Sequence, residues 1–261
     1  MERDVLAAVR QELLKCIDEK TRDSAQRFFK EAVKFHGVKS ALGKKIATKY
    51  FREIKDRDKN EIFSLCENLL QANFGEEAFI AFEWSYSLRR KYEREDFLVF
   101  ERWVDLYVDN WAKCDTLCNH TLGTFVEMYP QFIENLAFWA RSENRWLRRA
   151  SAVTLILPAR KGLFLKEVFE ISAILLTDKD DMVQKGYGWL LKEASKKHQA
   201  EVFDYVMSWK AMMPRTALRY AIEKMPTEMR KKAMEKEILT PSGAPSISQI
   251  TVLPLDDILE I

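Results

Sequence analysis

The feature that most constrains this chain is the spacing of its apolar residues. From residue 3 to about residue 236 they recur at positions i, i+3, i+4 and i+7, in segments separated by short polar connectors. This period places the apolar side chains on one face of an α-helix, and no segment in the span alternates as a β-strand does. There are only eight glycines and seven prolines, and three of the prolines lie beyond residue 240. The pattern therefore predicts an all-α protein.

The predicted helices follow one another in antiparallel pairs. Their ranges are 4–18, 39–54, 59–72, 76–92, 96–108, 111–129, 132–142, 145–157, 164–178, 181–197 and 199–211. Ser142 and Asn144 precede one helix and Asp180 and Asp181 another, as helix-starting residues do, and Pro130 follows a third. Pairs recur about every 35 to 45 residues, which is typical of HEAT-like repeats stacked into a curved solenoid with a concave groove. A compact helical bundle would bury the same faces without forming a groove.

Charge is distributed unevenly along the chain. The net charge of +2 divides into −2 for residues 1–140, +8 for residues 141–236 and −4 for residues 237–261. A basic second half predicts a concave groove for an anionic partner, although lysine-rich helix faces in solvent would give the same count. We expect a helical-repeat domain over residues 1–236. Residues 237–261 would form a tail in which a linker precedes a short segment that either docks or stays disordered.

The four cysteines show neither a metal-binding nor a disulfide pattern. Cys16 and Cys66 are isolated, and Cys114 and Cys118 with His120 fall short of a zinc ligand set. The N-terminal sequence has no apolar run long enough for a signal peptide or a membrane span. We therefore expect a cytoplasmic protein with reduced thiols, no metal and no membrane partner.

Trp111 and Asp115 stand four residues apart in the segment DNWAKCD and therefore share one helical face. A protein core favours the indole and solvent favours the carboxylate, so neither environment alone suits this face. The combination indicates a groove, although each residue taken singly has a structural explanation.

A second segment, RWLRR, places Trp146 on the same helical face as Arg145 and Arg149. Asn144 is a candidate N-cap for this helix. Its first turn would then offer both backbone N–H groups and arginines to a phosphate. A tryptophan in the core with arginines in solvent would explain the same pattern.

A third segment, QKGYGWLLKEA, contains Gly186 and Gly188 inside an otherwise strong helix. Each glycine costs about 1 kcal/mol relative to alanine, so either a neighbouring helix or a ligand backbone is expected to approach closely. Trp189 and Lys192, one turn apart, add an aromatic surface beside a cation. Tight helix packing around a core tryptophan accounts for these residues equally well.

The three segments recur at about one helical repeat. Trp111 and Arg149 are 38 residues apart, and Arg149 and Trp189 are 40 apart. In a solenoid, residues at this spacing lie side by side on the concave face. The sequence therefore predicts that these side chains and Asp115 converge in one groove.

In these motifs the sequence resembles the AlkD-like family of DNA alkylation repair proteins, over roughly residues 10–225. The matching motifs are the Trp-x3-Asp of NWAKCD, RWLRR and QKGYGWLLKEA, in the family's order, with FFKEAVKFHGVKS as a weaker match. The resemblance implies a HEAT-repeat DNA glycosylase that hydrolyses the N-glycosidic bond of positively charged N3- and N7-alkylated purines in duplex DNA. It further implies action without base flipping. We expect a monomer that uses no cofactor.

The resemblance also implies roles for individual residues. Asp115 would be the catalytic carboxylate, with Trp111 and Trp189 as aromatic walls and Arg149 as a backbone clamp near the lesion. DNA contacts would come from a further set, namely Arg145, Arg148, Lys185, Lys192, Phe28 and Lys39. Phe28 stands where the family can have a tyrosine and lacks its hydroxyl. Lys192 stands where an arginine can occur and lacks the bidentate fork.

Two other functions would use the same residues differently. A non-catalytic relative could bind DNA or recognise its structure without excising a base, and the departures at Phe28 and Lys192 favour it. A protein-interaction solenoid could hold an acidic peptide in its basic concave face, but it would not need an aspartate between two tryptophans. Base release and salt-dependent DNA binding distinguish the three functions.

Overall fold

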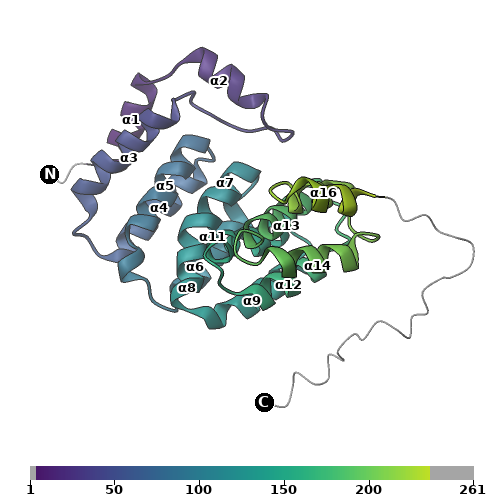
Figure 1. Cartoon of the computed structure of the whole chain (residues 1–261). Helices are drawn as coiled ribbons and strands as arrows, with labels where there is room; N and C mark the ends of the chain where they lie inside the picture. Colours follow the sequence, from purple (N-terminus) through teal and green to yellow (C-terminus); the bar gives the residue numbers. More distant parts are fainter. Residues whose placement is uncertain (1–3, 236–261) are drawn as a thin grey trace, which may run out of the picture.

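The computed structural model describes residues 4–235, and these residues form helices joined by short connections (Figure 1). The first half contains α1 (Val5–Lys15), α2 (Glu19–Gln26), α3 (Ser40–Ile54), α4 (Lys59–Gln71), α5 (Gly75–Ser87), α6 (Asp96–Tyr107), α7 (Trp111–Thr116) and α8 (Gly123–Met128). The second half contains α9 (Ile133–Trp139), α10 (Arg145–Thr154), α11 (Ile156–Arg160), α12 (Leu165–Ile174), α13 (Asp181–Ala194), α14 (Gln199–Trp209), α15 (Arg215–Ala221) and α16 (Thr227–Met234). The predicted all-α class is confirmed. The tail predicted for residues 237–261 lies outside the described residues.

Two long predicted helices are interrupted in the structure. The helix expected over 111–129 consists of α7, a π-helical turn over Leu117–Leu122, and α8. The helix expected over 145–157 ends at Thr154, and α11 begins at Ile156 after Leu155. Pro158 lacks the N–H that a continuous helix would donate to the Thr154 carbonyl, so the break falls where that hydrogen bond would be.

Side-chain caps fix several helix starts that the sequence indicated. The Asn144 side chain accepts a hydrogen bond from the Trp146 N–H at 2.9 Å, and α10 begins at the next residue. Asp180 accepts from the N–H groups of Met182 and Val183, and α13 follows it. These caps satisfy backbone donors that have no partner inside the helix.

The helices stack as a helical-repeat solenoid (Figure 1). Helices α3, α5, α7, α10, α13 and α15 form an inner row in which each contacts the next. The outer helices pack behind this row, with α4 against α5, α9 against α10, and α12 and α14 against α13. Residues of α7, α10, α13 and α15 can therefore meet on one face, although they are far apart in the sequence.

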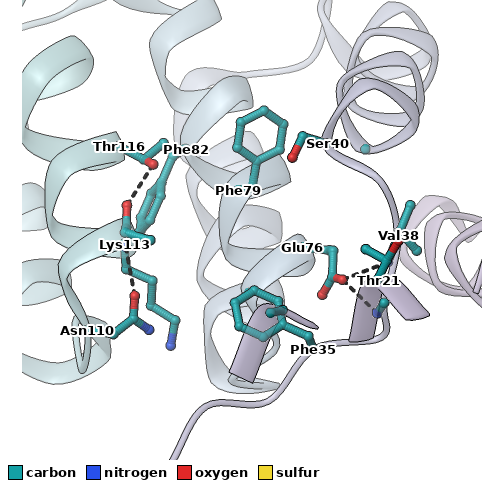
Figure 2. Close-up of a pocket in the computed structure, with 15 residues that line it drawn as sticks. Thr21, Phe35, Val38, Ser40, Glu76, Phe79, Phe82, Asn110, Lys113 and Thr116 are labelled. Carbon is teal, nitrogen blue, oxygen red and sulfur yellow. Dashed lines mark hydrogen bonds between the residues drawn. The ribbon is translucent and has the colours of Figure 1, made fainter. Parts of the chain in front are cut away.

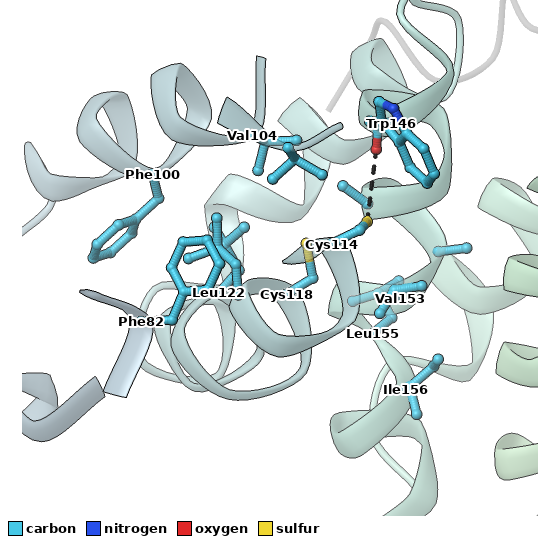
Figure 3. Packing of buried hydrophobic residues seen from close by; sticks show 14 of the residues in the cluster. Phe82, Phe100, Val104, Cys114, Cys118, Leu122, Trp146, Val153, Leu155 and Ile156 are labelled. Atoms are coloured by element: carbon cyan, nitrogen blue, oxygen red, sulfur yellow. Dashed lines mark hydrogen bonds between the residues drawn. The ribbon is translucent and has the colours of Figure 1, made fainter. Parts of the chain in front are cut away.

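The buried apolar residues form one cluster that extends through the stack of helices, and Figure 3 shows a part of it. Trp84, Trp103 and Tyr187 are fully buried in it. Cys114 and Cys118 are also fully buried, and the Cys114 thiol points toward the carbonyl oxygen of Trp146 at 3.9 Å. Burial of this kind is common for free cysteines and accounts for their spacing without a ligand.

The two glycines of α13 have separate structural explanations. A Cβ at Gly188 would lie 2.7 Å from both the Ala217 carbonyl oxygen and the Tyr220 Cβ, so α15 packs directly on this position. A Cβ at Gly186 would lie 3.4 Å from the Arg149 Cγ. Close helix packing therefore explains Gly188, whereas Gly186 makes room for an arginine side chain.

Within residues 4–235, the helices all fall short of the length and apolarity that a membrane crossing requires.

We expect Gly188→Ala to lower the free energy of unfolding by about 1 to 3 kcal/mol, because the new methyl group overpacks the backbone of α15. Urea denaturation measures this change. Gly43→Ala in α3 is the matched control, since its Cβ would have no closer neighbour than the Phe79 Cδ1 at 3.9 Å. There helix propensity should raise stability by about 0.5 to 1 kcal/mol. Stabilisation by both substitutions would contradict the tight α13–α15 contact.

Candidate functional site

A cleft of about 330 Å³ opens where the inner helices α7, α10, α13 and α15 meet. Its lining residues are Phe28, Trp111, Asp115, Arg149, Met182, Lys185, Trp189 and Tyr220. Six of the ten residues singled out from the sequence are among them, and they come from segments far apart in the chain. Met182 and Tyr220 were not anticipated.

Helix α7 brings Trp111 and Asp115 to the cleft together. Trp111 is the first residue of the helix, and the Asn110 side chain caps it by accepting from the Lys113 N–H. Asp115 follows one turn later, on the same face. Its side chain is 18% exposed, so this face is neither core nor open solvent.

A bidentate ion pair joins Asp115 to Arg149 of α10. The Arg149 Nε donates to Asp115 Oδ1 at 3.0 Å, and Nη2 donates to Oδ2 at 2.9 Å. The Arg149 side chain is only 6% exposed, and its Nη1 donates to the Met182 carbonyl oxygen. Arg149 thus bridges α7 and α13, and the missing side chain of Gly186 gives it room.

Burial raises the pKa of the Asp115 carboxyl above its ordinary value, against the opposing effect of the neighbouring Arg149 guanidinium. Burial tends to lower the pKa of the Arg149 guanidinium. The negative charge of Asp115 and the hydrogen bonds between the two side chains outweigh this effect and raise that pKa above its ordinary value. Each charge is therefore costly alone and is retained because of the other. The site holds a carboxylate that water solvates poorly.

Trp189 is oriented by a charged network behind it. Its indole Nε1 donates to Glu193 Oε1 at 3.3 Å, and Glu193 is 5% exposed. Arg160 and Lys196 each reach the other oxygen of Glu193 at 2.6 Å. Burial tends to raise the pKa of the Glu193 carboxyl, but these two cations bring it below its ordinary value. Glu193 is therefore a stable acceptor that fixes the indole ring.

Residues 27–34, which we call the strap, follow α2 in a loop (Figure 1), and Phe28 of the strap lines the cleft. The Phe29 ring stacks on Trp111 with the centroids 5.2 Å apart, and the Trp111 indole N–H donates to the Phe28 carbonyl oxygen at 3.4 Å. Lys30 pairs with Asp181 at 2.7 Å, and Glu31 pairs with Arg145 at 3.4 Å. The strap therefore binds α7, α10 and α13 near the cleft, and it leaves the Phe28 side chain 74% exposed at the cleft edge.

The remaining predicted DNA-binding cations do not line the cleft. Arg145 stacks on the Trp146 ring and lies beside Asp180, while Arg148 pairs with Asp178 at 2.7 Å on the neighbouring surface. Lys192 pairs with Glu223, and its ammonium lies 5.4 Å from the Tyr220 ring centroid, so it adjoins the cleft. Lys39 is exposed beside Asp18, away from these residues.

A separate cavity of about 250 Å³ lies on another face of α7 (Figure 2). Phe79, Phe82 and Thr116 are among its lining residues, and none of the ten predicted site residues belongs to them. At its edge Glu76 accepts hydrogen bonds from the N–H groups of His36, Gly37 and Val38, which anchors the chain that follows the strap. Among residues 4–235, no group of three or more His, Cys, Asp or Glu side chains is placed to hold a metal ion.

The residues missed by sequence reasoning come from the fourth helix of the cleft and from the strap. Tyr220 follows Trp189 by 31 residues, which is shorter than the repeat of 35 to 45 residues, and no motif marks it. Met182 precedes Lys185 by one helical turn. Phe29 adjoins Phe28 and would have been found only if the stacking on Trp111 had been known.

Fold and cleft together define a helical-repeat protein with a buried acid–arginine pair between two tryptophans. The sequence model of the family described as DNA alkylation repair enzyme matches residues 9–225, and the chain belongs to this family. Membership indicates a role in DNA repair, with DNA as the partner.

A solved structure with a similar fold is a predicted DNA alkylation repair enzyme from Enterococcus faecalis. The two chains are 16% identical and superimpose with a TM-score of 0.73, over 81% of this chain and 97% of that one. At this identity the likeness concerns the fold. Comparison with curated proteins finds no match.

We expect Lys30→Met to loosen the strap, because it removes the ion pair with Asp181 that ties the strap to α13. Hydrogen exchange at the Phe28, Phe29 and Val33 amides should become severalfold faster. Lys20→Met in α2 is the control, since this lysine is exposed away from the cleft. Unchanged exchange in Lys30→Met would show that the strap is held without this pair.

Proposed function

We propose that this protein is a DNA glycosylase that hydrolyses the N-glycosidic bond of positively charged N3- or N7-alkylated purines in duplex DNA. The observation that carries the proposal is the Asp115 carboxylate, held by Arg149 and flanked by Trp111 and Trp189 in an accessible cleft. This arrangement suits a reaction in which positive charge develops on a sugar.

The chemistry follows from the charge of the lesion. An alkylated purine already carries the positive charge, so the electron pair of the C1′–N bond leaves with it as a neutral base, and no general acid is required. The deoxyribose becomes an oxocarbenium-like cation, which a carboxylate in a poorly solvated site stabilises strongly. Water then adds to C1′, and Asp115 is placed to accept its proton. The indole faces stabilise the same cation.

Arg149 has a different task from the one its motif suggested. Three of its N–H groups donate to Asp115 and Met182, which leaves two of its five donors for a ligand. In this proposal Arg149 positions the carboxylate and keeps it ionised despite its burial. The backbone clamp stays a prediction that depends on those two donors.

The surrounding cations support a duplex as the substrate. Lys185 lines the cleft, and Arg145 and Lys192 adjoin it from α10 and α13. Such cations hold phosphates in register without reading sequence. Because Phe28 and Lys185 stand at the edge of the cleft and the aromatic rings line its sides, we propose that the damaged base stays in the duplex while its sugar faces Asp115.

One observation favours a second candidate, a DNA-binding relative that releases no base. Both oxygens of Asp115 already accept hydrogen bonds from Arg149, so their remaining lone pairs alone are available to a sugar or a water molecule. The absence of a tyrosine hydroxyl at Phe28 and of a bidentate arginine fork at Lys192 also favours this candidate. Steep salt dependence of duplex binding without release of methylated purines would establish this alternative.

We expect Asp115→Asn to lower the single-turnover rate of 7-methylguanine release from methylated duplex DNA by at least about a hundredfold, because the neutral amide cannot stabilise the sugar cation. Thermal unfolding shows whether the variant remains folded. Asp204→Asn on the outer helix α14 is the control and should release base at the wild-type rate. Equal rates for wild type and folded Asp115→Asn would exclude the assigned role.

The raised pKa of Asp115 sets the pH dependence of the reaction. The carboxylate is the active form, so kcat/KM should fall as pH falls through a pKa above the ordinary aspartate value of 3.8. Rates corrected for spontaneous base loss give this profile, and the residual activity of Asp115→Asn should lack the acidic limb. An acidic limb retained by the variant would assign the titration to another group.

A further inference from the structure

One polar group in the cleft differs from the rest. The indole N–H groups of Trp111 and Trp189 donate to Phe28 and Glu193, and Lys185 pairs with Asp181. Asp115 and Arg149 bond to each other. The Tyr220 hydroxyl, by contrast, has no hydrogen-bond partner among residues 4–235, and no other lining residue carries a hydroxyl.

The packing of α15 explains why this hydroxyl stands at the cleft. Gly188 lets the backbone of α15 approach α13 so closely that a Cβ there would meet Tyr220 Cβ at 2.7 Å. The Cβ of Tyr220 is therefore held against the backbone of α13 at Gly188, the residue before Trp189. Gly188 lowers the intrinsic stability of α13, but its lack of a side chain allows Tyr220 of α15 to pack directly on this helix.

The neighbouring charge indicates which ligand atom the hydroxyl would meet. The Lys192 ammonium lies 5.4 Å from the Tyr220 ring centroid, and its side chain is only 13% exposed. It pairs with Glu223 through one hydrogen bond of 2.9 Å, which leaves further donors on the ammonium. A positive potential beside a free O–H favours an anionic acceptor over the cationic base of an alkylated purine.

We propose that the Tyr220 hydroxyl, together with Lys192, binds a phosphate oxygen of the strand that carries the damaged nucleotide. The O–H donates to the phosphate and Lys192 supplies the balancing charge. Because Tyr220 lines the cleft from α15 and Asp115 lines it from α7, this contact holds the strand along the α15 side of the cleft. Tyr220 thus contributes to the binding of DNA, and its role rests on the function proposed above.

The test compares Tyr220→Phe with wild type in two measurements. This substitution removes only the hydroxyl, so the ring packing on Gly188 and Lys192 is retained. Fluorescence anisotropy with an undamaged duplex should show a Kd raised about tenfold, as expected for one hydrogen bond to a charged group. Single-turnover base release at saturating protein should change little. Tyr205→Phe on α14, whose hydroxyl donates to the Phe169 carbonyl, is the control and should bind as wild type does.

Duplexes with a neutral methylphosphonate at single positions identify the phosphate. At one position the substitution should weaken wild-type binding more than it weakens binding by Tyr220→Phe, because the variant retains only the Lys192 contact with that phosphate. Additive losses at every position, or an unchanged Kd in Tyr220→Phe, would overturn the proposal. A variant that binds normally but releases base slowly would also overturn it, by placing the hydroxyl on the base. Wild type that binds DNA without releasing base would contradict the glycosylase instead and leave the phosphate contact measurable.

Discussion

The buried pair of Asp115 and Arg149 is the interaction on which the cleft depends. Neither charge could remain in a site so little exposed without the other, because the loss of hydration would cost several kcal/mol for each ion. The pair also crosses the inner row, since Arg149 binds α7 through Asp115 and α13 through the Met182 carbonyl. One guanidinium therefore holds helices α7, α10 and α13 together, and Trp111 and Trp189 line the same cleft. An isolated carboxylate would have been driven to its neutral form.

The surroundings of this pair show how a solenoid builds a site from separate helices. Each of the helices α7, α10, α13 and α15 contributes between one and three of the lining side chains, and different local contacts orient several of them. Asn110 caps the helix that begins with Trp111, Glu193 holds the indole of Trp189, and Gly188 admits Tyr220. These contacts lie within one helix or between two neighbouring helices, in keeping with the nearest-neighbour packing of repeats.

Much of this arrangement follows from local sequence. Apolar periodicity predicted the helices, the caps at Asn144 and Asp180 predicted two of their starts, and the repeat spacing predicted that Trp111, Arg149 and Trp189 would meet. Periodicity missed the breaks at Leu155 and in Leu117–Leu122, because an interrupted helix keeps its apolar stripe. It also could not reveal that Arg149 faces inward, since Gly186, which makes room for it, is compatible with several kinds of close approach. The strap was beyond prediction because its contacts join residues about 80 to 150 positions apart.

The cations around the cleft form two groups that differ in solvent exposure and in how strongly their ion pairs hold. Arg149 is buried, and its bonds to Asp115 are strengthened by low polarizability around them, so an incoming phosphate cannot displace the carboxylate at little cost. Lys30, Lys185 and Arg145 pair with Asp181 and Glu31 nearer to solvent, where such pairs contribute little and salt weakens them further. A phosphate backbone can therefore exchange with these carboxylates while the central pair stays intact. In the function proposed above, Asp181 and Glu31 hold these cations near the cleft in the absence of DNA, and the geometry of the Asp115–Arg149 pair does not depend on the exchange.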